Sequence, residues 1–309
     1  GESYDVYKLS SGQIMYNKSR KKSMPDLADK VVKLRDQIEG MDKEFVYVQL
    51  PFKIKDSSVM PPGTETGGNE NADEMVDILR KEDVDVINIK EEIEKEGLEW
   101  APLFFTTDHH WKPQTGIWES GLIMQRLGDK YGFSVDSSHY DYDSYDKETY
   151  SNYMLGAVGR RVGAWYAGLD DIDIVYPKFS TDMDFTGESK DGTDNRSGAF
   201  EDAVYLWDNL AKRSDFINNS YSTYIGKEYA ASELINNLNE DGPRILLIRD
   251  SFSCVIQPFI ALDASDVIAI DLRRYKKSVK EACEEYDPDI VILAYNPSAF
   301  SKRQFDFFK

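Results

Sequence analysis

The chain has 309 residues and carries 56 acidic side chains against 37 basic ones, which gives a formal net charge of −19. This charge argues against nucleic acid and anionic membrane surfaces as partners, because both would repel an acidic protein. The sequence has no apolar run near the ~18 residues that a membrane span needs and no signal-peptide pattern at its start, and its length allows one large α/β domain with an insertion.

The first 136 residues alternate between predicted strands and helices. Apolar residues recur at helical spacing in several stretches, and short apolar runs bounded by Pro, Gly or Asp mark the strands. Such alternation is typical of a parallel sheet covered by helices. The predicted elements are a hairpin over 4–16, a helix over 26–38, a strand over 45–50, a loop over 60–71, a helix over 74–81, a strand over 84–89 and helices over 91–96 and 115–131.

The composition changes between residues 137 and 229, where Tyr, Asp, Ser and Gly dominate and helix–strand alternation is lost. A strand-like piece at 173–176 and a loop at 187–198 predict an insertion of hairpins and loops. We expect this segment to cover the strand ends as a lid or a glycan platform, because aromatic rings stack on sugars; alternatively, its aromatic residues form the insertion's own small core. The candidates are Tyr140, Tyr142, Tyr145, Trp165 and Tyr166.

The last segment, 230–309, returns to strand–helix alternation, with strands predicted over 245–248, 267–270 and 289–294 and a helix over 277–285. Asp250 and Ser251 follow the first of these strands directly. Ligands of open parallel sheets collect outside the carboxyl ends of the strands, so Ser251 is placed for chemistry. The alternative is that the Asp-Ser pair only caps a helix.

The stretch 106–113 contains His109 and His110, two of only three histidines in the chain, the third being His139. Asp108 and His110 are two residues apart, and in an extended segment such side chains point the same way. A carboxylate, an imidazole and a serine hydroxyl can together form a nucleophilic triad. We therefore predict Ser251 as nucleophile, His110 as base and Asp108 as the group that orients it; alternatively, Asp108 caps the following helix.

A metal site built from Asp108, His109 and His110 is a weaker alternative. Adjacent histidines in an extended segment point to opposite faces, so both would not easily ligate one ion. We therefore expect neither a metal nor a cofactor. On this geometry His109 lies away from Ser251. The two cysteines, Cys254 and Cys283, can pair, but they give no disulfide framework in a chain of this length.

The Asp-His-His-Trp motif, followed by Pro113 and Gly116 and far downstream by Asp-Ser-Phe-Ser, resembles the DHHW family. That family is related to the alginate O-acetyltransferases and to SGNH/GDSL-type hydrolases. The resemblance implies an α/β, flavodoxin-like three-layer sandwich with a mostly parallel central sheet. Compared with the usual SGNH arrangement, the serine block comes late and the Asp/His block early, as though the chain were circularly permuted.

The resemblance also suggests further site residues. Asn296 falls where an oxyanion donor is expected, beside the backbone N–H of Ser251, although Asn-Pro is also a common turn. Arg249 replaces the glycine that precedes Asp-Ser in the hydrolase motif, so it implies an ordinary backbone or a side chain turned away from the cleft. Arg273 or Arg274 can bind an anionic substrate group such as a uronate or phosphate, or pair with surface carboxylates.

These residues predict a serine-dependent O-acyl transferase or esterase, with acetyl as the expected group and an extracellular or cell-wall polysaccharide as substrate. A non-catalytic glycan-binding or surface protein with the same fold is the alternative. The start without Met and the resemblance suggest an extracellular or cell-surface protein whose N-terminal anchor is absent from this chain. We further expect a monomer and a membrane-bound acyl-donor partner.

Overall fold

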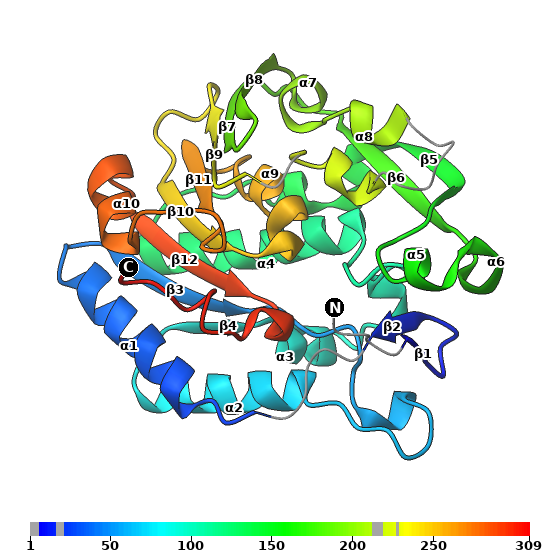
Figure 1. The fold of residues 1–309 in the computed structure, drawn as a ribbon. Helices are drawn as coiled ribbons and strands as arrows, with labels where there is room; N and C mark the ends of the chain where they lie inside the picture. The colour runs from blue at the N-terminus through cyan, green and yellow to red at the C-terminus, as the bar shows by residue number, and fades with distance from the viewer. Residues whose placement is uncertain (1–5, 17–21, 212–218, 227–228) are drawn as a thin grey trace.

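A computed structural model describes residues 6–16, 22–211, 219–226 and 229–309 (Figure 1). Its main feature is an eight-stranded mixed sheet. Along the sheet the strands are β4 (Val86–Asn88), β3 (Glu44–Gln49), β12 (Ile290–Tyr295), β10 (Arg244–Arg249), β11 (Asp266–Ile270), β9 (Ala231–Asn236), β7 (Met183–Ser189) and β8 (Gly192–Gly198).

The five strands from β4 to β11 are parallel, and β9, β7 and β8 continue the sheet in antiparallel fashion. If the parallel strands are numbered from β10 onward, wrapping round through the chain termini, their spatial order is 2-1-3-4-5. This is the flavodoxin-like order. The structure thus confirms the predicted α/β fold with a mostly parallel sheet, and its motif order is that of a circular permutation.

Helices cover both faces of the sheet, because each central strand is apolar on both sides. In β10, Ile245 and Leu247 face one core, whereas Leu246 and Ile248 face the other. The second core is covered by α1 (Pro25–Glu39), α2 (Gly68–Lys81) and α10 (Val279–Tyr286). The first is covered by α3 (Ile89–Lys95), α4 (Pro113–Tyr131) and α9 (Gln257–Ile260).

The N-terminal hairpin of β1 (Val6–Lys8) and β2 (Ile14–Tyr16) forms as predicted, with Gly12 in its turn at a φ of 87°. Tyr4, also included in that prediction, lies outside the described residues. The predicted loop 60–71 is shorter than expected because α2 already begins at Gly68.

The segment 137–229 contributes to two sheets. β5 (Tyr145–Met154) and β6 (Asp170–Pro177) pair as a separate ribbon, which includes the strand-like piece predicted at 173–176. The stretch 187–198 is not a loop, since β7 and β8 pair there and extend the central sheet. β8 is an edge strand of polar residues, which tolerate exposure better than apolar ones. The segment also holds the short helices α5 (Gly159–Val162), α6 (Ala164–Ala167), α7 (Phe200–Val204) and α8 (Asp208–Ala211).

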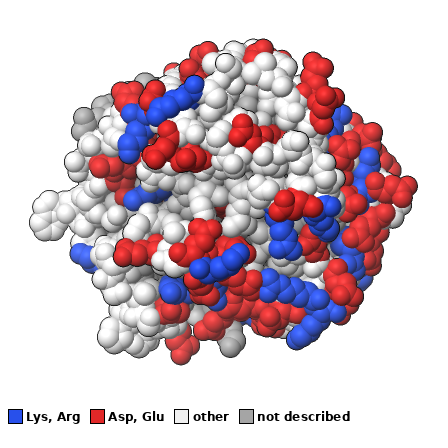
Figure 2. Space-filling model, turned by 180° about the vertical axis from the view of Figure 1, so that it is seen from behind, with Lys and Arg blue, Asp and Glu red and all other residues white. Residues whose placement is uncertain are grey.

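Cys254 and Cys283 are both buried and unpaired, so they do not form the disulfide that the sequence left open. Cys254 belongs to the core on one face of the sheet and Cys283 to the core on the other, so the sheet separates them. Asp and Glu residues are spread over the face seen in Figure 2, with Lys and Arg interspersed among them. In the described part of the chain, no helix combines the length and apolar character needed to cross a bilayer.

Candidate active site

The candidate site lies where the strand order reverses, between β10 and β12. Ser251 follows β10 and Asn296 follows β12, and the carboxyl ends of parallel strands at such a point form the crevice in which ligands bind. Asp250 caps the short 3-10 helix Ser251–Val255, accepting a hydrogen bond from Phe252 N at 2.9 Å. The capping role and the placement of Ser251 at the crevice therefore coexist.

Asp250 is itself buried at this turn. Its other carboxylate oxygen accepts from Asn296 N at 2.8 Å, which ties the loop after β10 to the loop after β12. Burial raises the pKa of the Asp250 carboxyl to about 6, although the N–H groups of Asn296 and Phe252 act in the opposite direction. The carboxyl thus titrates within the range in which enzymes are commonly assayed.

The loop that carries Asp108 and His110 is held by two buried charged residues. Lys53 Nζ donates to the carbonyl oxygens of Asp108 at 2.7 Å and Thr106 at 3.1 Å. Asp170 accepts from the backbone N–H groups of Thr106 and Thr107 at 2.6 and 2.7 Å. Burial lowers the pKa of Lys53 to about 7 against the opposing effect of Asp170 and Asp108. These contacts bend the loop, so it is not the extended segment that the sequence predicted.

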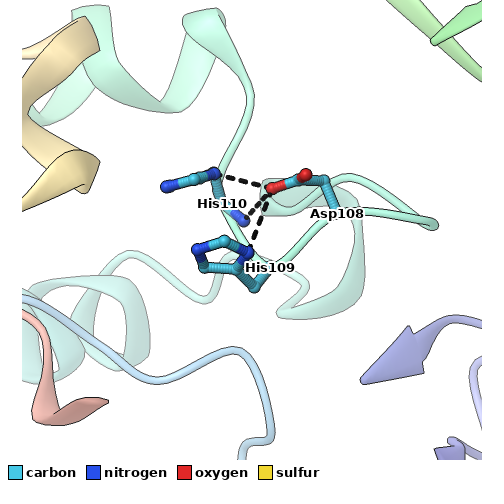
Figure 3. Close-up of side chains that lie close together, drawn as sticks. All are labelled: Asp108, His109 and His110. Carbon is cyan, nitrogen blue, oxygen red and sulfur yellow. Dashed lines mark hydrogen bonds and ion pairs between the residues drawn. The ribbon is translucent and has the colours of Figure 1, made fainter. Parts of the chain in front are cut away.

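A chain of hydrogen bonds joins the three predicted triad residues. Ser251 Oγ lies 2.7 Å from His110 Nε2. His110 Nδ1 in turn lies 2.6 Å from Asp108 Oδ1 (Figure 3). Asp108 is 0% exposed, and its Oδ2 accepts from Ala157 N at 2.6 Å. Burial by itself would raise the pKa of this carboxyl, but His109, His110 and the hydrogen bonds hold it well below its usual range. Asp108 is therefore ionised where an imidazolium would form.

His109 does not point to the opposite face, and on this the prediction was wrong. Its Nδ1 lies 3.4 Å from Asp108 Oδ1, and the rings of His109 and His110 are 3.8 Å apart between centroids (Figure 3). His109 Nδ1 also lies 3.2 Å from the Tyr16 hydroxyl. The bend at Asp108 brings both imidazoles to one side, so His109 lines the same pocket as Ser251.

One ligand atom from each of Asp108, His109 and His110 lies within 4.8 Å of the others, so the geometric objection to a metal site no longer holds. However, Asp108 Oδ1 already accepts from His110 N and faces His110 Nδ1 at 2.6 Å, and Oδ2 accepts from Ala157 N. An ion would have to displace the Asp108–His110 contact. This donor set therefore fits an oriented imidazole better than a metal.

Two aromatic residues brace the site. Trp111, the last residue of the motif, donates from Nε1 to the Phe252 carbonyl at 3.0 Å and so joins the histidine loop to the serine turn. Tyr221 was not predicted. Its ring stacks on His110, with centroids 4.1 Å apart and planes at 10°, and its hydroxyl donates to the carbonyls of Ser251 and Phe252 at 3.1 and 3.0 Å. Tyr221 lies 30 residues before Ser251, and no local motif in the sequence marks it.

The remaining predicted residues surround a pocket of about 180 Å³. Asn296 lines it, and its Nδ2 donates to the Pro51 carbonyl at 2.5 Å. Arg273 lines it as well, and it forms an ion pair at 2.6 Å with Asp271, which is a buried carboxylate rather than one of the surface carboxylates expected. Arg249 is a regular residue of β10, with its side chain buried against Cys254.

The aromatic residues of the segment 137–229 divide into two groups. Tyr145 is buried, and Tyr140 and Tyr142 pack against the same core on one face of the central sheet, so these three do not form a separate small core of the insertion as the alternative proposed. Trp165 and Tyr166, on α6, are 99% and 52% exposed. The latter pair is therefore available to a ligand, and the former three serve packing.

Comparison with solved structures finds the same fold in several proteins. PatB1 of Bacillus cereus matches with a TM-score of 0.79 at 20% identity, over 99% of this chain and 100% of PatB1. A DHHW family protein of Eubacterium siraeum matches with a TM-score of 0.65 at 14% identity, over 98% of this chain and 97% of the other. The O-acetyltransferase domain of Pseudomonas putida AlgJ matches with a TM-score of 0.55 at 10% identity, over 96% and 92%.

No family model matches the sequence, and no curated protein matches it. The structural matches nevertheless extend over nearly the whole chain, so the resemblance predicted from two short motifs is confirmed at the level of the fold. The chain has the SGNH-like α/β fold that it shares with PatB1, a DHHW family protein and the AlgJ O-acetyltransferase domain.

Proposed function

We propose that this chain is a serine-dependent O-acyl transferase or esterase, with acetyl as the acyl group and a polysaccharide as substrate. The observation that carries the proposal is the continuous hydrogen-bond chain from Ser251 Oγ through His110 to Asp108. The fold shared with an O-acetyltransferase domain supports the same class of reaction. An adjacent pocket of about 180 Å³ suits a short acyl group.

In the proposed mechanism, Ser251 Oγ attacks the carbonyl carbon of the acyl donor while His110 Nε2 takes the hydroxyl proton. Asp108 stabilises the resulting imidazolium through His110 Nδ1. The backbone N–H of Ser251 and the second N–H of Asn296 Nδ2 donate to the oxyanion of the tetrahedral intermediate. As the intermediate collapses, His110 returns the proton to the leaving oxygen, which yields the acyl-enzyme and a free hydroxyl.

In the second half of the reaction, a water molecule or a sugar hydroxyl attacks the acyl-enzyme. His110 accepts the proton of this nucleophile and then gives it to Ser251 Oγ as the ester bond to the enzyme breaks. Water gives hydrolysis and a sugar hydroxyl gives transfer, so both outcomes use the same residues. Water exclusion around Ser251 decides between them.

The proposal extends to the setting of the protein. We infer an extracellular or cell-surface monomer that takes its acyl group from a membrane-bound partner, as the resemblance to exported acetyltransferases implies. The segment 137–229 would serve as the lid or glycan platform, since it carries the exposed pair Trp165 and Tyr166. The second candidate function is a glycan-binding protein without catalysis, which the buried Arg249 in place of a motif glycine keeps open.

Covalent labelling tests the proposal. A sulfonyl fluoride should modify Ser251, because an activated serine displaces fluoride to form a sulfonyl ester; the related PatB1 has been solved with a sulfonyl adduct. Mass spectrometry of tryptic peptides should locate the adduct on Ser251 and find none in Ser251→Ala. Ser253→Ala is the matched control, since Ser253 is buried two residues away. An unlabelled wild-type chain that also fails to hydrolyse 4-nitrophenyl acetate would favour the glycan-binding alternative.

A further inference from the structure

A second and larger pocket adjoins the one at Ser251. Its volume is about 810 Å³, and Arg273 lines both pockets. Arg273 lies in the loop that follows β11, the parallel neighbour of β10. Since parallel strands end at the same edge of the sheet, this loop and Ser251 lie side by side. A polymer with one sugar at Ser251 can therefore continue into the larger pocket.

The larger pocket is basic in a strongly acidic protein. Among its described lining residues, five are basic and two, Glu188 and Asp191, are acidic. The whole chain, by contrast, has 19 more acidic than basic residues. Such a local reversal of charge attracts anions from a surface that otherwise repels them. The basic residues are Lys190, Arg273, Arg274, Lys276 and Arg303.

Two of these basic residues, Lys276 and Arg303, are the candidates for contact with a ligand. The Arg273 guanidinium is engaged by Asp271, so it forms the wall between the pockets rather than a further binding charge. Arg303 is exposed, and its Nη2 donates to the Arg273 carbonyl at 2.5 Å, which positions it over the loop after β11. Lys276, in the same loop, is exposed as well. The loop is braced by a second contact, from Lys309 Nζ to the Leu272 carbonyl at 2.9 Å.

We propose that this pocket binds an anionic group, a carboxylate or a phosphate, on the glycan whose acylated or acceptor sugar lies at Ser251. Lys276 and Arg303 contact the anion, and Arg273 separates it from the reacting ester. The inference rests on the proposed function only for what lies at Ser251. It adds that an anionic glycan is selected over a neutral one, because a neutral sugar gains nothing from the local excess of positive charge.

The test measures binding in a Ser251→Ala background, where turnover cannot change the ligand. Isothermal titration calorimetry compares tetragalacturonate with its neutral methyl ester, and a glycerol phosphate tetramer provides the phosphate arm. We expect the carboxylate or the phosphate probe to bind at least about tenfold more tightly than the methyl ester, as charge-assisted hydrogen bonds allow. Added NaCl should weaken the binding of the anionic probe and leave the methyl ester little changed.

The pocket variant Lys276→Gln/Arg303→Gln should weaken the binding of the anionic probe by about tenfold. The matched control is Lys33→Gln/Lys95→Gln, which removes the same charge from side chains that are 63% and 74% exposed on α1 and α3. The control should change affinity by less than about twofold, since charges beyond a Debye length are screened. Thermal unfolding checks that each variant is folded, and the comparison of probes needs no pocket variant at all.

Equal affinity for charged and neutral probes, or no binding of either anionic probe, would overturn the inference. So would an equal loss in the control variant, because the effect would then be one of net charge. Failure here is distinguishable from failure of the proposed function. If Ser251 is labelled by the sulfonyl fluoride and the probes are not distinguished, the anion site alone is rejected; if labelling fails and anions still bind at the pocket, the site belongs to a glycan-binding protein.

Discussion

Asp108→Asn is the substitution for which the structure makes the most specific prediction. The carboxylate accepts from His110 N and contacts His110 Nδ1 through Oδ1, and it accepts from Ala157 N through Oδ2. An asparagine has only one oxygen for these donors. One side of the site must therefore face an amide NH₂ group that cannot accept a hydrogen bond.

The two orientations of the new amide fail for different reasons. With NH₂ toward Ala157, a buried backbone N–H loses its acceptor, which costs about 1–3 kcal/mol of folding free energy. With NH₂ toward His110, Nδ1 must accept, so the ring proton moves to Nε2 and the imidazole cannot take the proton of Ser251. In both cases the imidazolium loses a charge partner worth about 4 kcal/mol near an effective dielectric constant of 20, or about a thousandfold in rate.

We therefore expect Asp108→Asn to lower kcat for 4-nitrophenyl acetate by about 10³- to 10⁴-fold. Asp263→Asn is the matched control. Asp263 is another buried carboxylate that accepts a backbone hydrogen bond, from Asp136 N at 3.1 Å, but it precedes β11 and so lies at the opposite end of the sheet from Ser251. A variant with asparagine at position 108 that kept its rate within tenfold of wild type, or an equal loss in the control, would refute the triad assignment.

Three further predictions follow from the same geometry. His110→Gln should lose roughly 10²- to 10⁴-fold in rate on an acetyl ester, because His110 Nε2 lies 2.7 Å from Ser251 Oγ. His109→Gln should retain measurable turnover, and the opposite ranking would reassign the base. Tyr221→Leu removes the ring that stacks on His110 and should lower kcat by about 2- to 30-fold. Tyr221→Phe keeps the ring and should keep kcat, but it removes the hydroxyl that donates to the Ser251 carbonyl and should lose about 1–3 kcal/mol in urea unfolding. Equal kcat in the two variants would show that the ring has no role. The pKa of Asp250 is raised to about 6 in the folded protein, so its stabilising contribution is complete only well below pH ~4 and is lost as pH rises through about 6. Between pH 4 and 7, wild type should therefore lose about 2 kcal/mol more than Asp250→Asn in urea unfolding, and parallel pH curves would contradict this.

Much of the fold is predictable from the sequence because the central strands are apolar on both faces. The run Ile245–Ile248 marks β10 without ambiguity, and the helix spacing of 115–131 marks α4. The failures fall where polar residues are used in regular structure. β8 consists of Gly192–Gly198 with polar residues between, and the first turn of α2 buries Asn69 and Asn71. Such stretches look like loops until their neighbours are known.

The candidate site is predictable from the sequence only in part. The types and spacing of Asp108, His110 and Ser251 suffice to predict that they meet, and the structure brings them together. The orientation of His109 is not predictable in this way. The bend at position 108 depends on Lys53 and Asp170, which are 55 and 63 residues from the residues that they bind. No local periodicity encodes contacts of that range, and their catalytic consequence stays a prediction.

The segment 137–229 contacts the Asp108 loop too closely to be only a lid. Ala157 N donates to Asp108 Oδ2, and Gly156 lies so close that a Cβ atom there would be 2.3 Å from the Asp108 Cβ. A side chain at position 156 would have to push the carboxylate away from His110, since a fixed backbone leaves no room for it. Tyr221, from the same segment, stacks on His110. The segment whose composition sets it apart from the α/β core thus supplies contacts to both the Asp108 carboxylate and the His110 imidazole, so we expect the orientation of His110 to depend on these contacts.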